Sequence, residues 1–503
     1  MLLSQKTRQA VGLSLQDALV VVDEAHNLPE AIRSLHASKL TATVVQAALD
    51  QLQAYTTRYA DRLAGRNVLY LGQIRKILLS FQKLFKQTTE RSLCSVTEFV
   101  IQRRLQNINL FRVMRYLERS RLSQKLLGFT NNASNKDQAT ESELSRHFSA
   151  LSVVETFLEK LTLSGSDGKI VIEPSVNDKP AAIRYVLLQP SIYFENVLRE
   201  AHALALVGGT LRPFVHMAAE LLGDDVLIQE AARADQALRS SSVLRTRNLT
   251  AFSCGHVVPA SHVLLQCWRT GPTRQTLDFR YRARTTPAVC DELGRSLLRL
   301  ARAVPHGMVV FLPSYAYEAH TVQHFTSSGL WKQLAQHKTL HREPKSARGV
   351  EAALRSYSID AGSERGSLLF SVIGGKMSEG INFSDEKARC VVVVGLPYPD
   401  ISDPELREKM AALDRSNTIK GKDYVQNLCM RAVNQSVGRA IRHANDYASI
   451  ILLDERYTTD SRIQNGLPSW LRRGETWKKD TATEAKIAQL SSFYSDLKGD
   501  KSD

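Results

Sequence analysis

The stretch that most constrains this chain is Val20–His26, where an apolar, β-branched run ends in two carboxylates and an imidazole. Leu19–Val22 has the pattern of a parallel strand that is buried on both faces. Because α/β folds place ligands at the carboxyl ends of such strands, Asp23 and Glu24 are predicted at a ligand-binding sheet edge. One carboxylate there can hold Mg²⁺ through water and the other can activate an attacking water. The alternative is a strand that ends in a solvated Asp-Glu turn, because short motifs match by chance.

A second constraint lies far along the chain, where Gln435, Arg439 and Arg442 are spaced three and four residues apart. This spacing predicts that a helix over 427–442 carries all three on one face. A glutamine and two arginines suit the oxygens of a phosphoryl group in transfer. The alternative is a solvated basic helix face. Taken with the acidic strand end, the pattern predicts a nucleotide held between two lobes.

Four segments resemble, in their sequences and in their order along the chain, the motifs of the XPD-like iron–sulfur DNA helicases of superfamily two. Asp23–His26 resembles the DEAH box, and Gly208–Pro213 resembles the motif that follows a later strand of the first lobe. Gly375–Phe383 and Gln435–Arg442 resemble two motifs of the second lobe. Such motifs identify a mechanism only in the right structural context, which the structure can test.

Two more segments, Phe252–Val257 and Val304–Tyr457, narrow the resemblance to the ChlR-type cohesion helicases. The resemblance covers nearly the whole chain. It implies an ATP-dependent 5′→3′ DNA helicase that acts in replication, repair and sister-chromatid cohesion in the nucleus. The implied partners are single-stranded or forked DNA and cohesion or replication-fork proteins, and the implied oligomeric state is a monomer.

The resemblance also implies nucleotide-facing roles for specific residues. Asp23 would hold Mg²⁺ through water and Glu24 would be the general base, while His26 and Thr210 would relay between ATP and DNA. The remaining residues would contact the γ-phosphate or face both nucleotide and DNA: Gln435, Arg439, Arg442, Glu379 and Gly380. Asn382 stands where the family commonly has Asp, which puts the contact at that position in doubt.

Three residues are candidates for nucleic-acid contact. Ser314 resembles a hydroxyl residue that contacts the nucleic-acid backbone in the second lobe, although serine is also a common helix N-cap. Arg103 and Arg112 belong to a strongly basic region over 101–127. A DNA-facing surface and a solvated helix face are equally good interpretations of that region.

The charge balance and the cysteines set broad limits. The 503 residues carry 66 Lys and Arg against 51 Asp and Glu, a formal charge of +15, which suits a polyanionic partner or simply favours solubility. The six cysteines include no C-x-x-C pair and are interpreted as reduced thiols. No apolar stretch approaches the length needed to span a bilayer, so no membrane partner is expected.

The sequence contains no G-x-x-x-x-G-K-[ST] phosphate-binding loop. In the helicases that the chain resembles, this loop and the four iron–sulfur cysteines precede the DEAH box, so Met1 is interpreted as an internal methionine of a longer, truncated protein. ATP and Mg²⁺ are the expected cofactors, whereas the ligands of a 4Fe–4S cluster are absent from this chain. A catalytically inactive module that binds nucleic acid or a partner protein is the alternative function, and an RNA helicase is a third.

The predicted fold class is α/β, with two RecA-like parallel-sheet lobes, the first incomplete, and a helical arch insertion. The predicted domains are residues 1–37 and 180–213 for lobe one, 38–179 for the arch, 214–478 for lobe two and 479–503 for a tail. Strands that alternate with helices favour such parallel sheets with right-handed crossovers.

Overall fold

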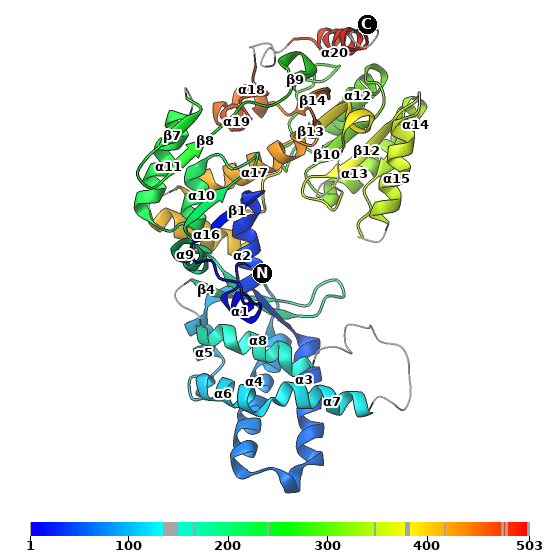
Figure 1. The fold of residues 1–503 in the computed structure, drawn as a ribbon. Helices are drawn as coiled ribbons and strands as arrows, with labels where there is room; N and C mark the ends of the chain where they lie inside the picture. Colours follow the sequence, from blue (N-terminus) through cyan, green and yellow to red (C-terminus); the bar gives the residue numbers. More distant parts are fainter. Residues whose placement is uncertain are drawn as a thin grey trace. The chain divides into compact units, whose positions relative to one another are not determined.

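The computed structural model describes residues 2–133, 149–163, 167–238, 241–346, 349–377, 383–416, 419–473, 477 and 481–499. The chain forms two compact units, drawn in Figure 1. The first unit comprises Met1–Arg233 with Ile401–Thr418, and the second comprises Ala234–Asp400 with Ile419–Asp503. Residues 401–418, which the sequence placed within lobe two, thus cluster with the first unit, while the functional domain boundaries stay predictions.

The second unit is built on a six-stranded sheet in the order β11-β12-β10-β13-β14-β9, with every neighbouring pair parallel. All residues of β10, β12, β13 and β14 are buried, as their apolar runs predict. The α/β fold class with RecA-like parallel sheets is therefore confirmed. The strands are β9 (Val263–Trp268), β10 (Met308–Leu312), β11 (Thr339–Arg342), β12 (Ser367–Val372), β13 (Cys390–Val394) and β14 (Ala448–Leu453).

Helices cover both faces of this sheet. Because successive strand residues point to opposite faces, Val391 and Val393 of β13 pack into one core and Val392 packs into the other. The core around Val392 includes α12 (Pro287–Ala303), α13 (Tyr315–Ser327), α14 (Leu330–His337) and α20 (Thr483–Gly499). The opposite core includes α15 (Val350–Ala361), α17 (Gly421–Val437), α18 (Arg456–Thr459) and α19 (Ser461–Gly466).

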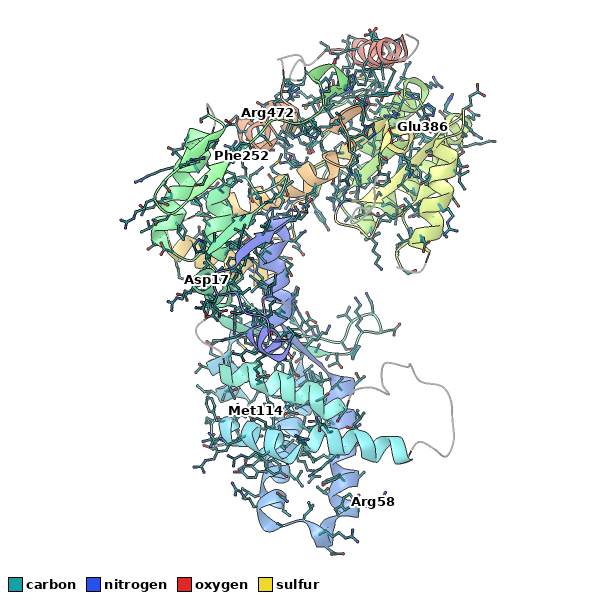
Figure 2. All side chains as sticks on the ribbon, viewed as in Figure 1. Asp17, Arg58, Met114, Phe252, Glu386 and Arg472 are labelled. Atoms are coloured by element: carbon teal, nitrogen blue, oxygen red, sulfur yellow. The ribbon has the colours of Figure 1, made fainter. Side chains whose placement is uncertain are left out.

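The second unit also contains a small antiparallel hairpin of β7 (Val243–Arg245) and β8 (Thr250–Phe252). The Phe252 side chain at its end is 61% exposed and is labelled in Figure 2. The helix α11 (Asp225–Ala237) precedes this hairpin in the chain.

The first unit contains a parallel pair, β1 (Leu19–Val22) and β6 (Ala203–Leu206). Both strands were predicted, but the expected burial of β1 on both faces is wrong. Val20 is buried whereas Val21 is 58% exposed, because the apolar cluster lies on one face of the pair only. This cluster includes residues of α2 (Leu28–His36), α9 (Ser191–Glu200) and α10 (Phe214–Leu221).

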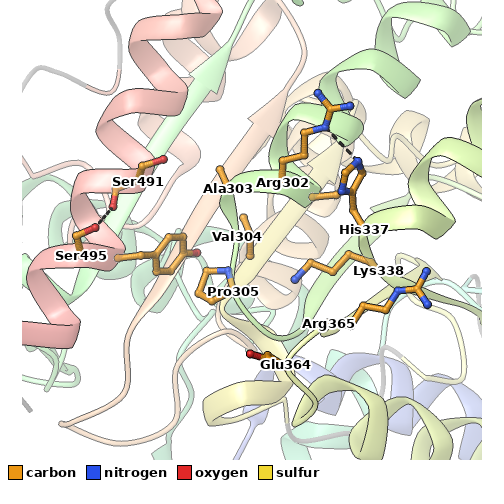
Figure 3. Close-up of a pocket in the computed structure, with 12 residues that line it drawn as sticks. Arg302, Ala303, Val304, Pro305, His337, Lys338, Glu364, Arg365, Ser491 and Ser495 are labelled. Carbon is orange, nitrogen blue, oxygen red and sulfur yellow. Dashed lines mark hydrogen bonds between the residues drawn. The ribbon is translucent and has the colours of Figure 1, made fainter.

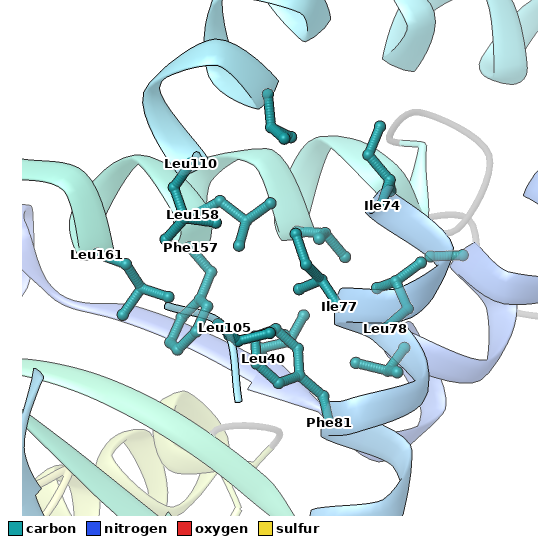
Figure 4. Close-up of a cluster of buried hydrophobic side chains, with 14 of the residues drawn as sticks. Leu40, Ile74, Ile77, Leu78, Phe81, Leu105, Leu110, Phe157, Leu158 and Leu161 are labelled. Carbon is teal, nitrogen blue, oxygen red and sulfur yellow. The ribbon is translucent and has the colours of Figure 1, made fainter. Parts of the chain in front are cut away.

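The rest of the first unit is a four-stranded antiparallel sheet in the order β2-β5-β4-β3, packed against a helical core (Figure 4). Residues 180–213 were predicted for lobe one, but β5 (Ala182–Leu187) within them pairs with β2 (Ser38–Thr41) and β4 (Gly168–Glu173), which lie in the predicted arch. The strands β2 and β3 (Ser92–Ser95) lie in the region 38–179, which was predicted as a helical arch. Its helices are α3 (Ala42–Arg58), α4 (Gly65–Gln87), α5 (Val96–Gln102), α6 (Leu110–Ser120), α7 (Leu122–Ala133) and α8 (Ala150–Leu163).

The helix α16 (Pro404–Ser416) is attached to the first unit by ion pairs along its first half. Glu405 pairs with Arg184 at 3.2 Å, and Glu408 pairs with Lys169 at 3.1 Å. Lys409 pairs with the buried carboxylate of Glu220. These pairs explain why a segment that follows β13 in sequence belongs to the other compact unit.

Candidate nucleotide and nucleic-acid sites

The Asp-Glu-Ala-His turn of the first unit begins where β1 ends. Glu24 adopts the left-handed conformation (φ 46°, ψ 44°), which is uncommon for a residue other than glycine. Its backbone N–H is bonded to Asp23 Oδ1 at 2.8 Å, and its Oε2 lies 3.1 Å from Nδ1 of His26. Both carboxylate residues are exposed while the His26 side chain is 8% exposed. The turn therefore presents two carboxylates to solvent from a fixed backbone.

The segment after β6 lies directly beside this turn. The Ala25 N–H donates to the Val207 carbonyl at 2.9 Å, and the Val207 N–H donates to the Val22 carbonyl at 2.9 Å. A Cβ added at Gly208 would lie 3.6 Å from Glu24 Cα, so glycine permits this close approach without requiring it. Thr210 Oγ1 is buried and has no hydrogen-bond partner among the described residues. The structure thus places the Gly208–Pro213 segment next to the carboxylate turn. The predicted relay between ATP and DNA would need this proximity.

The helix expected over 427–442 begins and ends earlier than predicted. α17 ends at Val437, and Gly438 caps it by donating its N–H to the Asn434 carbonyl at 2.9 Å. Gln435 lies in the last helical turn, whereas Arg439 and Arg442 follow the helix. The prediction that one helix face carries all three residues is therefore wrong.

The loop after α17 is held by a buried carboxylate that sequence reasoning missed. Asp446 accepts the Arg442 backbone N–H at 3.2 Å and the Arg389 guanidinium at 2.8 Å. The guanidinium carbon of Arg389 in turn lies 3.9 Å from the centroid of the Tyr447 ring. These contacts favour a loop over a continued helix, and the acidic residue four positions after Arg442 was the signal that could have been noticed.

Asp385, His443 and Asp446 form the one group of potential metal ligands found among the described residues. His443 Nε2 lies 3.0 Å from Asp385 Oδ1. Burial raises the pKa of Asp385, but the hydrogen bond and charge of His443 and the charge of Arg389 outweigh it and lower the pKa. Because Arg389 already supplies a positive charge to Asp446, the group forms an ion-pair network rather than a cation site.

The remaining candidate residues have separate positions. Ser314 is the N-cap of α13 and accepts the Tyr317 N–H at 3.2 Å, which confirms its structural interpretation. Arg103 follows α5 and is half-buried, whereas Arg112 is exposed on the first turn of α6. Glu379 and Gly380 lie outside the described residues.

A cavity of about 460 Å³ lies at the amino ends of β10, β11 and β12 (Figure 3). Arg302, in its lining, belongs to the last turn of α12, where a cation complements the helix dipole. Its Nε–H donates to Nε2 of His337, in the last turn of α14, at 3.1 Å. Lys338 is buried there and donates to the His306 carbonyl at 2.8 Å. Parallel folds place their ligands at the carboxyl ends of the strands, and this cavity lies at the opposite edge of the sheet.

The cysteines do not form a cluster-binding set. Cys254 is exposed and Cys94 is half-buried, while the other four are buried, and all six are free. Burial raises the pKa of the Cys390 and Cys429 thiols to about 12, which disfavours the thiolate that binds metal. None of the described helices combines the length and apolar character that a bilayer crossing requires.

Two family models match parts of the chain. Residues 297–474 match the family described as "Helicase C-terminal domain", and residues 1–45 match the DEAD_2 family. The first match includes the six-stranded unit's β10 to β14, and the second includes β1 and the carboxylate turn. Over these two segments the chain is therefore similar to helicase C-terminal domains and to DEAD_2 domains.

Individual relatives identify the group more closely. The ATP-dependent DNA helicase DDX11 of Mus musculus is 37% identical over 94% of this chain, and the ATP-dependent DNA helicase chl1 of Schizosaccharomyces pombe is 33% identical over 98%. The chain is thus a homologue of the DDX11/CHL1 ATP-dependent DNA helicases, and the resemblance to XPD-like DEAH-box helicases is confirmed. It spans 56% and 59% of the lengths of these two relatives.

Solved structures support the same fold. The Xpd4 structure from S. tokodaii matches with a TM-score of 0.56 and 17% identity, over 93% of this chain and 79% of that one. A second XPD structure matches with a TM-score of 0.52 and 16% identity, over 92% of this chain and 78% of that one. At these identities the likeness concerns the fold alone.

Proposed function

We propose that the protein represented by this chain is an ATP-dependent DNA helicase that acts in replication, repair and sister-chromatid cohesion in the nucleus and moves 5′→3′. The observation that carries the proposal is the carboxylate turn at the end of β1, with the Ala25 N–H bonded to the Val207 carbonyl beside it. Relatives named ATP-dependent DNA helicases align along nearly the whole chain and support it further.

In this proposal Asp23 holds Mg²⁺ through water and Glu24 positions and deprotonates the attacking water. Both carboxylates are exposed at a strand end, which fits these roles. When bound, ATP would supply the phosphoryl group, and Mg²⁺ would supply the positive charge that neutralises it. The residues proposed for coupling and for phosphate contact are His26, Thr210, Gln435, Arg439, Arg442, Glu379 and Gly380.

The proposed nucleic-acid partner is single-stranded or forked DNA, contacted by Ser314 and by the basic region that includes Arg103 and Arg112. Arg112 is the better-placed of the two arginines because it is exposed on α6. We further propose that the protein works as a monomer with cohesion or replication-fork partners. Lobe one is assigned to residues 1–37 and 180–213, the arch to 38–179, lobe two to 214–478 and a tail to 479–503.

Two features of the helicases that the chain resembles, the phosphate-binding loop and the 4Fe–4S cluster, do not fit this chain. The 503 residues contain no phosphate-binding loop, so the lysine and backbone N–H groups that cradle phosphates in such enzymes have no counterpart here. A 4Fe–4S cluster does not fit the cysteines, because four of the six are buried separately in the second unit. We therefore derive no role for a cluster in this chain.

The missing phosphate loop supports a second function for the 503-residue chain alone: nucleic-acid binding without catalysis. We predict negligible ATP hydrolysis in the presence of single-stranded DNA, because an uncradled triphosphate is poorly positioned for attack. The measurement is steady-state phosphate release by the wild type and by Glu24→Gln. Robust turnover that Glu24→Gln abolishes would overturn this prediction.

Binding measurements separate a DNA helicase from an RNA helicase. We expect fluorescence anisotropy to detect salt-dependent binding of a labelled single-stranded DNA by the wild-type chain. Arg112→Gln should weaken this binding severalfold, whereas Arg355→Gln, a matched control on α15 whose arginine pairs with Glu351, should not. Markedly tighter binding of the RNA of the same sequence would favour the RNA helicase instead.

A further inference from the structure

We propose that Tyr281, with Arg282 and Arg284, is a base-stacking platform for a single-stranded nucleic acid on the second unit. This inference rests on the proposed DNA-binding function and names a contact surface for it. The platform is the turn Arg280–Thr286, in which an aromatic residue alternates with basic residues. Single-strand binding sites commonly combine aromatic faces for the bases with positive charge for the phosphates.

The platform lies at the carboxyl edge of the six-stranded sheet. The Leu277 carbonyl accepts the N–H of Glu455, which follows β14. A Cβ added at Gly395, which follows β13, would lie 2.8 Å from Phe279 Cβ. The Tyr317 hydroxyl, on the helix that follows β10, donates to the Arg284 carbonyl at 3.1 Å. The segment therefore crosses the ends of three neighbouring strands, at the edge where this class of fold binds its ligands.

Hydrogen bonds hold the backbone of the turn, on which Tyr281 and Arg282 are exposed while Arg284 is half-buried. The Ala283 and Arg284 N–H groups donate to the Arg280 carbonyl at 3.0 and 2.9 Å. The Arg280 N–H is bonded to Asp278 Oδ1, and its guanidinium pairs with Asp278 and Glu455. A held backbone lowers the entropy lost when the exposed groups bind a ligand.

The exposed groups have the chemistry that a single strand requires. Tyr281 is 81% exposed, the most exposed of the large hydrophobic side chains in the described part of the chain. The Arg284 guanidinium carbon lies 5.0 Å from the Tyr281 ring centroid and 5.1 Å from that of Tyr317. Neither Arg282 nor Arg284 forms an ion pair with a carboxylate of the described residues, so their charges are available to phosphates. Each base has a π-face, which makes such a platform tolerant of sequence.

Ser314 lies close to the platform through a shared neighbour. Its hydroxyl accepts the Tyr317 N–H, while the Tyr317 ring packs under Arg284. A backbone phosphate near the start of α13 would thus have a guanidinium and a helix N-terminus within the same small region. The platform extends the predicted Ser314 contact toward the bases.

The test uses the 503-residue chain and a single-stranded oligonucleotide that contains 2-aminopurine, whose fluorescence reports stacking directly. We expect Tyr281→Ala to weaken binding about tenfold and to relieve the fluorescence quenching, as loss of one stacked base does. Tyr281→Phe should retain affinity within about twofold and keep the quenching, because its ring still stacks. Phe252→Ala, which removes an exposed aromatic ring from the β8 hairpin, is the control and should leave both readouts unchanged.

The charge of the platform is tested by salt dependence. Arg282→Gln should reduce the slope of log affinity against log salt by about 0.7, the value for one phosphate contact on a single strand. Arg365→Gln, which removes the same charge from the opposite edge of the sheet, should not change the slope. If the wild type binds and Tyr281→Ala binds with equal affinity and quenching, the platform is refuted and the proposed function stands. If the wild type binds no single strand, the proposed function fails together with the platform.

Discussion

The two parallel sheets of this molecule are built from similar sequences but have different surroundings. β13 of the second unit and β1 of the first are both short, β-branched runs. Every residue of β13 is buried between two strands and two helical layers, whereas β1 exposes Val21 by 58% and Leu19 by 67%. The comparison teaches that an apolar run predicts a strand, while the number of neighbours decides whether it is core.

The comparison is tested most severely by placing the same charge in both strands. Val392→Asp would bury an unpaired carboxylate in β13, so we expect the free energy of unfolding of the second unit to fall by roughly 4 kcal/mol or more. Val21→Asp places the carboxylate in solvent and should cost under about 1 kcal/mol. Urea unfolding followed by circular dichroism measures both. Equal losses would contradict the difference in burial.

The first unit contains a buried carboxylate that pairs with two cations. Glu220, with a side chain 4% exposed, is shared by Arg33 and Lys409. Burial lowers the pKa of Lys409 to about 8 even though Glu220 raises it. Lys409→Ala removes one of the two cations that pair with this buried carboxylate, and we expect a loss of about 2–4 kcal/mol in the free energy of unfolding.

Arg415→Ala is the matched control on the same helix. Its side chain is 66% exposed where it pairs with Glu408, so the loss should stay below about 1 kcal/mol. Urea unfolding of the two variants measures the difference. A Lys409→Ala variant as stable as Arg415→Ala would show that α16 is held by something other than this ion pair.

The last expected effect is a dependence of stability on pH, and it concerns a buried cation in the second unit. Burial lowers the pKa of Lys338 from 10.5 to about 8. Between these values the unfolded chain binds a proton that the folded chain has released, so Lys338 makes stability rise with pH from about 8 to 10.5. Lys338→Met should remove this contribution. Urea midpoints at pH 8 and pH 10 provide the measurement, and an unchanged difference between the two pH values would contradict it.

Strands of the second unit could be predicted from their continuous apolar runs. Val391–Val394 and Ile450–Leu453 are examples in which local pattern and tertiary burial agree. The exposure of Val21 could not be predicted, because it depends on whether another layer packs on the second face of β1. The antiparallel pairing of β5 with β2 was missed for a related reason: pairing is a long-range choice that periodicity does not record.

The candidate sites show the same division between local and distant information. The placement of Asp23 and Glu24 after β1 followed from the sequence, as did the N-cap at Ser314. The end of α17 before Arg439 did not, because it depends on Asp446 holding the loop against Arg389. The roles of these residues in catalysis and DNA contact stay predictions that the proposed variants test.

Hydrogen exchange of the 503-residue chain, with and without saturating single-stranded DNA, tests the central claim most directly. If the bound DNA runs over the carboxyl edge of the six-stranded sheet, it should slow hydrogen exchange of the backbone amides in 277–286 and 314–318. Amides in 301–306 and 362–366, at the opposite edge, should not change. DNA that binds the chain yet protects neither carboxyl-edge segment would contradict the account.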